Sequence, residues 1–226
     1  MIGIIGAMDI EMDYIKSILS DVKIINESGI DFVTGTAFGK TVVAAKCGIG
    51  KVYAALCAQT MILKFSPDVI VNTGVAGALS KGLSVFDVVV ADKVCQHDMD
   101  TSPIGDPKGL ISGINRIFFE CDVDAVQTLE KSGNVLGIKC VNGTIASGDQ
   151  FIADEALKSE INREFGACAC EMEGGSIGHV CFVNNVPFAV LRSISDSEGG
   201  ELDYLTFAKQ AADNAGHIME EFLKLW

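Results

Sequence analysis

The sequence predicts a single α/β domain, residues 1–226, with a central, twisted, mixed β-sheet flanked by α-helices. Apolar segments of strand length alternate along the chain with segments of helical periodicity. Several of the strands lack polar alternation, which is typical of strands that helices cover on both faces. No repeat, low-complexity tract or linker divides the 226 residues, a length that fits one domain with a large core.

Strands and helices alternate through the first half of the chain. The apolar run that ends near Gly6 predicts a buried strand, and a Phe-Gly-Lys turn at 38–40 joins two alternating segments as in a hairpin. Apolar residues from Val52 to Leu63 keep helical spacing. In chain order we expect a strand at 2–8, a helix at 10–19, hairpin strands at 32–36 and 41–46, a helix at 52–63, and strands at 67–74 and 86–92.

The second half continues this alternation after an irregular stretch. Segment 99–112 is rich in glycine and proline, a composition that suits a surface loop acting as a lid. Beyond it we expect a strand at 136–149, a helix at 153–165, a strand and turn at 167–175, a helix at 175–184 and a strand at 186–196. The last helix carries one apolar face, formed by Tyr204, Ala208, Ala211, Ala215, Ile218, Met219 and Phe222.

Charge and cysteine usage exclude several classes of protein. Lys and Arg total 17 against 30 Asp and Glu, so the net charge of −13 disfavours nucleic-acid and anionic-membrane partners. No apolar run has the length of a membrane span, and no basic segment precedes the first apolar stretch as in a signal peptide. The eight cysteines are scattered through apolar segments, which indicates reduced thiols. We therefore expect a cytoplasmic protein.

Small and acidic residues gather where the predicted strands end. Five such clusters occur, at 8–11, 72–74, 147–149, 171–173 and 193–196. In an α/β sheet, ligands bind at the carboxyl ends of strands. Ser, Asp and Gly also serve as helix caps and turn residues, so one cluster alone is ambiguous. Five together predict a carboxylate-rich site with a glycine-rich floor.

Other motifs in the chain carry little chemistry. The segment GIIGAM lacks the G-x-G-x-x-G dinucleotide fingerprint, and no P-loop is present. The pair His97-Asp98 is more typical of a loop-anchoring contact than of acid–base catalysis. Cys168 and Cys170 form C-x-C, and no His, Cys, Asp and Glu cluster has metal-ligand spacing. The sequence therefore implies no metal or organic cofactor.

Six segments, in order along nearly the whole chain, carry a family resemblance. They are GIIGAMDIEMD, CGIGKVYAA, PDVIVNTGVAG, SGDQFI, CEMEGGSIGHVC and VPFAVLRSISD. Together they resemble the methylthioadenosine/S-adenosylhomocysteine nucleosidases of the purine nucleoside phosphorylase-like superfamily. The resemblance implies hydrolysis of the N-glycosidic bond, which releases adenine and a thioribose. It also implies a role in methionine salvage and in recycling of S-adenosylmethionine by-products.

The resemblance assigns the catalytic chemistry to two carboxyl groups. Asp196 is implied to donate a proton to adenine N7, and Glu11 to take a proton from the attacking water. A free aspartate is ionised at pH 7, so Asp196 needs a burial-raised pKa for this role. Ser195 is expected to orient Asp196. Arg192 is expected to reach the water network or a glutamate; a structural ion pair is the alternative.

The remaining site residues are implied to bind the nucleoside. Glu173 would accept both ribose hydroxyls, because a carboxylate offers two acceptor oxygens. Met172 would pack against the sugar, with Glu171 behind it, while Phe151 stacks on adenine and the Ile152 backbone bonds its edge. Met8, Ile49 and Gly77 are implied to line the site. Either Tyr204 or Phe207 would close over the ligand; segment 197–203 is shorter than usual, which leaves the choice open.

The resemblance also separates a hydrolase from a phosphorylase. Phosphorylases of this superfamily hold phosphate with cationic groups that include an arginine beside the glycine-rich turn. Here that turn has no arginine, and Glu11 is expected near the vacated pocket, where its charge repels phosphate. Val75 stands where many members have serine, and Thr101, Ile104 and the pair at 174–175 also depart from the usual pattern. These departures bear on substrate preference and rate.

Three alternative functions and one assembly remain to be tested. The alternatives are a nucleoside phosphorylase, a non-catalytic nucleoside sensor that kept the fold, and a hydrolase of another adenosine derivative such as aminodeoxyfutalosine. The complete set of Glu11, Glu173 and Asp196 speaks against the sensor. The family resemblance implies a homodimer, in which segment 99–112 would reach the neighbour's site and complete an apolar pocket for the 5′-alkylthio group.

Overall fold

The strands of this chain join edge to edge into one mixed sheet. The computed structural model describes residues 1–196 and 201–226. Within these residues ten strands pair in the order β10-β6-β8-β9-β5-β1-β4-β3-β2, with β7 added beside β6. The strands are β1 (Ile2–Gly6), β2 (Ser20–Glu27), β3 (Ile30–Ala37), β4 (Lys40–Lys46), β5 (Val69–Ala78), β6 (Val88–Gln96), β7 (Phe118–Glu120), β8 (Cys140–Ser147), β9 (Ala167–Glu171) and β10 (Phe188–Asp196).

Half of the sheet closes on itself. β10 pairs in parallel with β5 and antiparallel with β6, while β6, β8 and β9 lead back to β5. The five strands β5, β10, β6, β8 and β9 therefore form a small closed barrel, and β1, β4, β3 and β2 extend from it. Closure converts the predicted twisted sheet into a curved wall that brings the ends of β5, β9 and β10 together.

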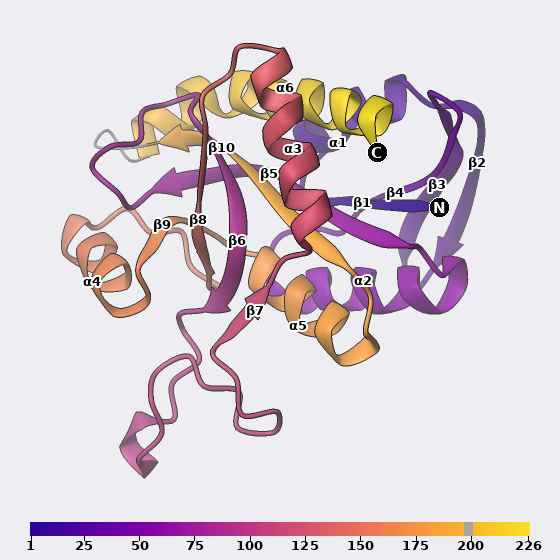
Figure 1. The fold of residues 1–226 in the computed structure, drawn as a ribbon. Helices are drawn as coiled ribbons and strands as arrows, with labels where there is room; N and C mark the ends of the chain where they lie inside the picture. The colour runs from indigo at the N-terminus through magenta and orange to yellow at the C-terminus, as the bar shows by residue number, and fades with distance from the viewer. Residues whose placement is uncertain (197–200) are drawn as a thin grey trace.

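Helices cover both faces of the sheet. The described residues form α1 (Asp9–Ser17), α2 (Lys51–Phe65), α3 (Val123–Val135), α4 (Glu155–Phe165), α5 (Gly174–Asn184), α6 (Glu201–Leu225) and the short 3-10 helix η1 (Ser102–Ile104). α1 and α3 pack with α6 on one face, and α2 packs with α5 on the other (Figure 1). In this part of the chain no helix is long and apolar enough to span a bilayer.

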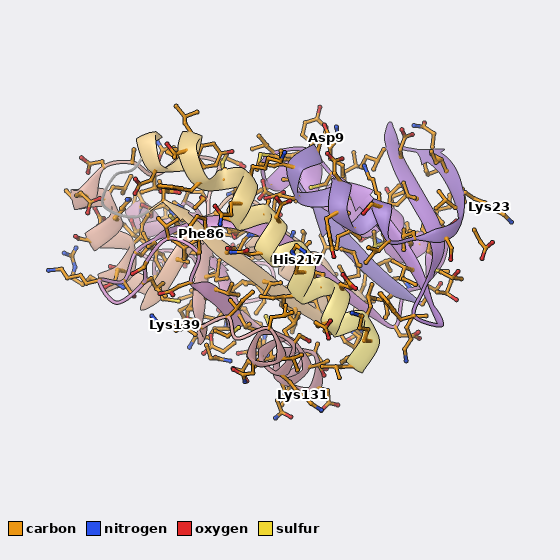
Figure 2. All side chains as sticks on the ribbon, turned by 90° about the horizontal axis from the view of Figure 1, so that it is seen from above. Asp9, Lys23, Phe86, Lys131, Lys139 and His217 are labelled. Carbon is orange, nitrogen blue, oxygen red and sulfur yellow. The ribbon has the colours of Figure 1, made fainter. Side chains whose placement is uncertain are left out.

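The central strands are buried on both faces, as their composition predicts. Every residue of β5 and of β10 is buried, including the polar Asn72, Arg192 and Asp196. Lysines such as Lys23 and Lys131 lie instead at the periphery of the molecule (Figure 2). Buried polar groups need partners, and the side chains of Asn72, Arg192 and Asp196 each form hydrogen bonds within the protein.

The structure confirms the predicted fold class and corrects several boundaries. β5 continues four residues beyond Gly74, so the cluster at 72–74 lies inside a strand and not at its end. The predicted strand at 86–92 begins at Val88 and runs on to Gln96. The elements β2, β7 and α3 were not predicted. The burial of β2 explains its case, because none of its residues is buried and it shows no buried alternate face.

Candidate active site

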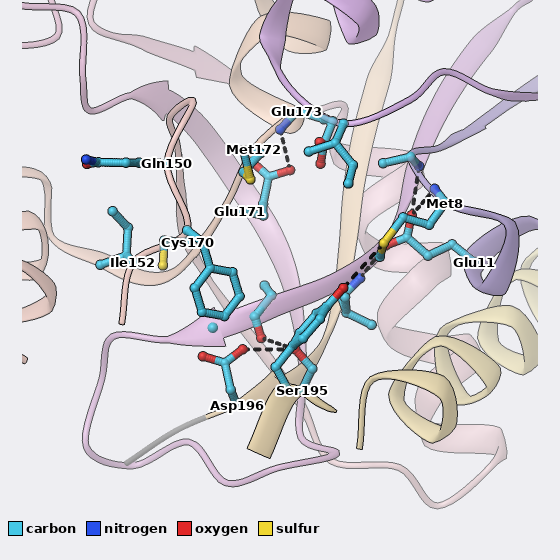
Figure 3. Close-up of a pocket in the computed structure, with 17 residues that line it drawn as sticks. Met8, Glu11, Gln150, Ile152, Cys170, Glu171, Met172, Glu173, Ser195 and Asp196 are labelled. Atoms are coloured by element: carbon cyan, nitrogen blue, oxygen red, sulfur yellow. Dashed lines mark hydrogen bonds between the residues drawn. The ribbon is translucent and has the colours of Figure 1, made fainter. Parts of the chain in front are cut away.

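One cavity lies at the carboxyl ends of β1, β5, β9 and β10. It encloses about 680 Å³, counting its open mouth, and its polar groups converge from α1, β9, β10 and the segment before α5 (Figure 3). The lining residues are Ala7, Met8, Glu11, Ile49, Val75, Ala76, Gly77, Gln150, Phe151, Ile152, Cys170, Glu171, Met172, Glu173, Ser195, Asp196 and Tyr204. Apolar walls with a few convergent carboxylates are typical of a small-molecule site.

Asp196 ends β10 and faces the cavity. Its Oδ1 accepts a hydrogen bond of 3.0 Å from the Ser195 hydroxyl. Burial raises the pKa of Asp196 above its usual range, although the Ser195 hydrogen bond opposes this effect. A Cβ at Gly77, which pairs with Asp196 across β5 and β10, would lie 2.9 Å from Asp196 Oδ2. Glycine at this position therefore leaves room for the carboxyl group.

Glu11 lies on the first turn of α1 with its carboxylate turned inward. Oε2 accepts the N–H groups of Ala7 at 2.7 Å and Met8 at 3.0 Å, and Oε1 accepts that of Val75 at 3.0 Å. Burial raises the pKa of Glu11, while the positive charge of Arg192 and these three N–H groups act against the rise. Backbone from β1 and β5 thus holds this carboxylate in one orientation.

Glu173 immediately precedes α5, and its carboxylate is buried beside the start of α2. Oε1 accepts the N–H of Gly50 at 2.9 Å, and Oε2 lies 3.7 Å from Arg192 Nη2. Burial and the nearby charge of Glu171 raise the pKa of Glu173 to about 7, against the opposing charge of Arg192. A carboxyl group with this pKa changes its charge near neutral pH.

A buried ion pair between Arg192 and Glu171 lies next to Glu173. Arg192 Nη2 donates to Glu171 and, at 2.5 Å, to Asn72 Oδ1. Burial alone would raise the pKa of Glu171, but Arg192 and hydrogen bonds from Ser147 and the backbone hold it below its usual range. Arg192 does not line the cavity. It was expected to reach the water network, a glutamate or a structural ion pair, and in the structure it contacts Glu171 and Glu173.

Aromatic side chains form the outer wall of the cavity. The ring of Tyr204, near the start of α6, meets the Phe151 ring edge-on at a centroid distance of 5.4 Å, and its hydroxyl lies 3.4 Å from Met8 Sδ. Phe207 lies one turn further along α6 and packs against Phe86, outside the lining residues. Tyr204 is therefore the residue positioned to close over a ligand. Part of the short segment 197–203, residues 197–200, lies outside the described residues.

Most of the other predicted residues also meet at this cavity. Met8, Ile49, Gly77, Ile152 and Met172 all line it. Asp9, from the cluster at 8–11, instead turns outward and forms an exposed ion pair of 2.8 Å with Lys46. This outcome follows from helix geometry, because Asp9 and Glu11 are two positions apart and therefore lie on different sides of α1.

Ala7, Ala76, Gln150 and Cys170 line the cavity but were not predicted. Cys170 pairs with Gly77 where β9 meets β5 antiparallel, a contact between distant segments that chain order does not reveal. Burial raises the pKa of the Cys170 thiol to about 12, so it is a neutral wall residue and not a nucleophile. Across the described residues, no group of three or more His, Cys, Asp or Glu side chains is arranged to hold a metal ion.

Comparison with known proteins agrees with this geometry. The model of the phosphorylase superfamily matches residues 1–224. A 5′-methylthioadenosine/S-adenosylhomocysteine nucleosidase of Halalkalibacterium halodurans is 37% identical over 96% of this chain and 95% of its own length. The chain belongs to the 5′-methylthioadenosine/S-adenosylhomocysteine nucleosidase family. The predicted resemblance is thereby confirmed.

Solved nucleosidase structures share the whole fold. The Neisseria meningitidis nucleosidase in complex with methylthio-immucillin-A superposes with a TM-score of 0.95 at 31% identity, over 99% of this chain and 98% of that one. A Helicobacter pylori structure named futalosine hydrolase superposes with a TM-score of 0.93 at 35% identity, over 98% and 96% of the two chains. Proteins of this fold thus carry names that refer to more than one nucleoside.

Proposed function

We propose that this protein hydrolyses the N-glycosidic bond of 5′-methylthioadenosine and S-adenosylhomocysteine, releasing adenine and the corresponding thioribose. The observation that carries the proposal is the environment of Glu11. Its carboxylate accepts hydrogen bonds from the N–H groups of Ala7, Met8 and Val75. These donors are therefore not free to bind an incoming phosphate. A negative charge at that place repels phosphate and accepts a proton from water, so hydrolysis is favoured over phosphorolysis.

Asp196 then acts as the general acid. Burial favours its neutral form, and the neutral form can donate a proton to N7 of the departing adenine. Protonation of the base withdraws electrons from the glycosidic bond as the sugar develops oxocarbenium character. Glu11 takes a proton from the water that attacks the sugar carbon. The two carboxyl groups reach the cavity from different elements, α1 and β10, which allows the acid and the base to work on opposite parts of the nucleoside.

Other residues of the cavity bind the nucleoside. Glu173 accepts hydrogen bonds from the ribose hydroxyls, and the half-exposed ring of Phe151 stacks on the adenine. Tyr204 closes the outer wall, and Arg192 keeps Glu171 and Glu173 in place. The apolar part of the lining, which includes Met8, Ile49 and Val75, suits a thioether substituent.

We also propose that the protein works as a cytoplasmic homodimer. On α2, Val52 is 78% exposed and Leu63 is 73% exposed, an apolar face that a second copy would cover. The segment between β6 and β7, which contains η1, extends away from the sheet on the side of α2 and α5 (Figure 1). From there it can reach the cavity of a partner subunit. All eight cysteines are free thiols, in keeping with a cytoplasmic location. An enzyme that cleaves methylthioadenosine there would take part in methionine salvage.

A substrate panel in phosphate-free buffer tests the proposed function. The panel contains methylthioadenosine, S-adenosylhomocysteine and aminodeoxyfutalosine, with adenine release as the readout. Methylthioadenosine and S-adenosylhomocysteine should both be cleaved without phosphate. Strict dependence on phosphate would make the protein a phosphorylase. Cleavage of aminodeoxyfutalosine alone would make the protein a hydrolase of another adenosine derivative, and binding without cleavage would make it a sensor.

A further inference from the structure

Three loops meet beside the cavity around one lysine. Lys51 begins α2, and its Nζ lies 2.5 Å from Asp98 Oδ1 and 4.0 Å from Asp149 Oδ2. The other oxygen of Asp98 accepts the backbone N–H of Asp149 at 2.9 Å. The backbone N–H of Lys51 in turn donates to Asp149 Oδ1 at 2.8 Å. These contacts form a closed ring that links the segments following β4, β6 and β8.

Asp149 supplies a helix cap that α2 lacks. The N-cap residue of α2 is Gly50, which has no side chain to cap the helix, and the first turn of α2 contains no acidic residue. The first N–H groups of a helix need acceptors, and a carboxylate there also opposes the positive end of the helix dipole. A Cβ at Gly50 would lie 3.0 Å from Asp149 Oδ1, and Gly50 has φ +97°. Glycine therefore allows the carboxylate of a distant loop to reach the helix end.

The ring joins loops whose neighbouring residues line opposite sides of the cavity. On one side, Gly50 donates its N–H to Glu173, and Ile49 lines the cavity. On the other side, Phe151 follows Asp149 by two residues and forms the aromatic wall. Neither Lys51 nor Asp98 lines the cavity. The ring therefore acts on a ligand only through the loops that it joins.

We propose that Lys51, Asp98 and Asp149 are positioning residues that set the distance between the sugar-binding carboxylate Glu173 and the base-stacking ring Phe151. This inference rests on the proposed nucleosidase function. With the ring intact, both subsites are held at the spacing of one nucleoside before it binds, which lowers the entropic cost of binding. Burial opposes the charge of Asp98, but Lys51 and the Asp149 N–H hold its pKa below the usual range, so Asp98 stays ionised at neutral pH.

The test compares Lys51→Met with Lys64→Met. Both lysines belong to α2, but Lys64 lies at the opposite end of the helix, where it pairs with Glu27 at 2.7 Å. Lys51→Met should raise the KM for methylthioadenosine about tenfold and change kcat less than about threefold, because the catalytic carboxyl groups keep their own contacts. The inhibition constant of adenine, which fills only the Phe151 side, should change much less than KM. Lys64→Met should leave both constants unchanged.

Two further variants separate positioning from general destabilisation. Lys51→Arg should restore KM to near the wild-type value, since it keeps a cation in reach of both carboxylates. Lys51→Met combined with Asp98→Asn should match Lys51→Met alone, because partners in one network are not additive. A tenfold rise in KM that Lys51→Arg does not rescue, or equal losses in the binding of adenine and of nucleoside, would overturn the proposal.

Amide hydrogen exchange provides a readout that does not depend on turnover. In Lys51→Met, peptides that cover 48–52 and 148–152 should exchange faster, while Lys64→Met leaves them unchanged. Faster exchange without a rise in the KM of an active enzyme would show that the ring is structural only. If the wild-type protein cleaves no adenosine derivative, the proposed function fails. The positioning role is then tested by binding alone: Lys51→Met should weaken methylthioadenosine binding more than adenine binding, and equal weakening would overturn it.

Discussion

At the scale of single residues, the environment separates the roles of chemically similar groups. Asp196, Glu11 and Glu173 are all buried carboxyl groups at one cavity. Asp196 has one hydroxyl donor beside it, Glu11 has three backbone N–H donors, and Glu173 lies beside another carboxylate and a guanidinium. Burial raises the pKa of both Asp196 and Glu11, which favours a neutral acid at Asp196, whereas at Glu11 three N–H donors oppose the rise and fix the orientation of the carboxyl oxygens.

Replacing the proposed acid tests that assignment. Asp196→Asn keeps the shape of the side chain but removes the proton that would go to adenine. We expect kcat to fall by about 10²–10⁴-fold, the usual size of a general-acid contribution, while methylthioadenosine still binds. Turnover in stopped assays and binding by calorimetry measure the two effects. A rate within threefold of wild type would remove Asp196 from the mechanism.

Glu173 gives a pH dependence whose sign follows from its raised pKa. Its pKa is about 7 in the folded protein and near 4.5 when unfolded, so the folded state binds the extra proton between these values. The stability that this proton provides is complete below pH 4.5 and is lost as pH rises through 7. Urea unfolding should show that wild type loses on the order of 3 kcal/mol more than Glu173→Gln between pH 4.5 and 8. Parallel pH profiles for the two proteins would contradict the raised pKa.

The sequence identified the site residues that lie in motifs better than those that long-range packing brings to the cavity. Glu11, Glu173 and Asp196 follow recognisable motifs, and all three line the cavity. Cys170 lines it only because β9 turns antiparallel beside β5, a long-range pairing that no local pattern encodes. The contact of Phe207 with Phe86 likewise depends on how α6 packs, so the choice between Phe207 and Tyr204 needed the structure.

At the scale of elements, β5 serves as the floor of the site. It contacts β1, β10 and β9, and its Gly74 and Gly77 leave room for two carboxyl groups. A Cβ at Gly74 would lie 2.3 Å from Glu11 Oε1 and 3.2 Å from Arg192 Nη1. This strand was predicted to end at Gly74, because the polar cluster there resembles a strand end. It continues because residues 75–77 pair with β10 and residues 77–78 pair with β9.

A single methyl group on β5 should therefore displace the proposed base. Gly74→Ala should lower kcat by about 10²-fold through misplacement of Glu11. Gly82→Ala is the matched control, since a Cβ at Gly82 meets nothing within 4 Å. Steady-state kinetics of the two variants measure the difference, and circular dichroism verifies that both are folded. Equal activity in the two variants would show that Glu11 has freedom to move.

At the scale of the whole molecule, the pattern of buried strands predicted the α/β class correctly. Periodicity located the helices that cover the sheet except α3, but the pairing of β10 with both β5 and β6 depends on contacts far apart in sequence. The exposed strand β2 carries Val22, Ile24 and Ile25 on a sheet edge, so its apolar residues mark no core face. These features escape local analysis because they arise from sheet closure and sheet edges.

The proposed dimer can be tested by disrupting the exposed face of α2. Sedimentation of the wild-type protein should give about twice the chain mass of 23.9 kDa. Leu56→Asp places a charge in that face and should produce a monomer with reduced turnover, since segment 99–112 then no longer reaches a neighbouring site. Lys131→Asp, on the opposite face in α3, is the control. A fully active monomer would show that each cavity is complete by itself.

The source of the oxygen on the released sugar tests the central claim most directly. The protein is incubated with methylthioadenosine in ¹⁸O-labelled water, with and without phosphate, and the sugar product is analysed by mass spectrometry. Hydrolysis with Glu11 as the base predicts one ¹⁸O in a free methylthioribose and an equal rate in both buffers. A sugar 1-phosphate, formed only when phosphate is present, would contradict the account.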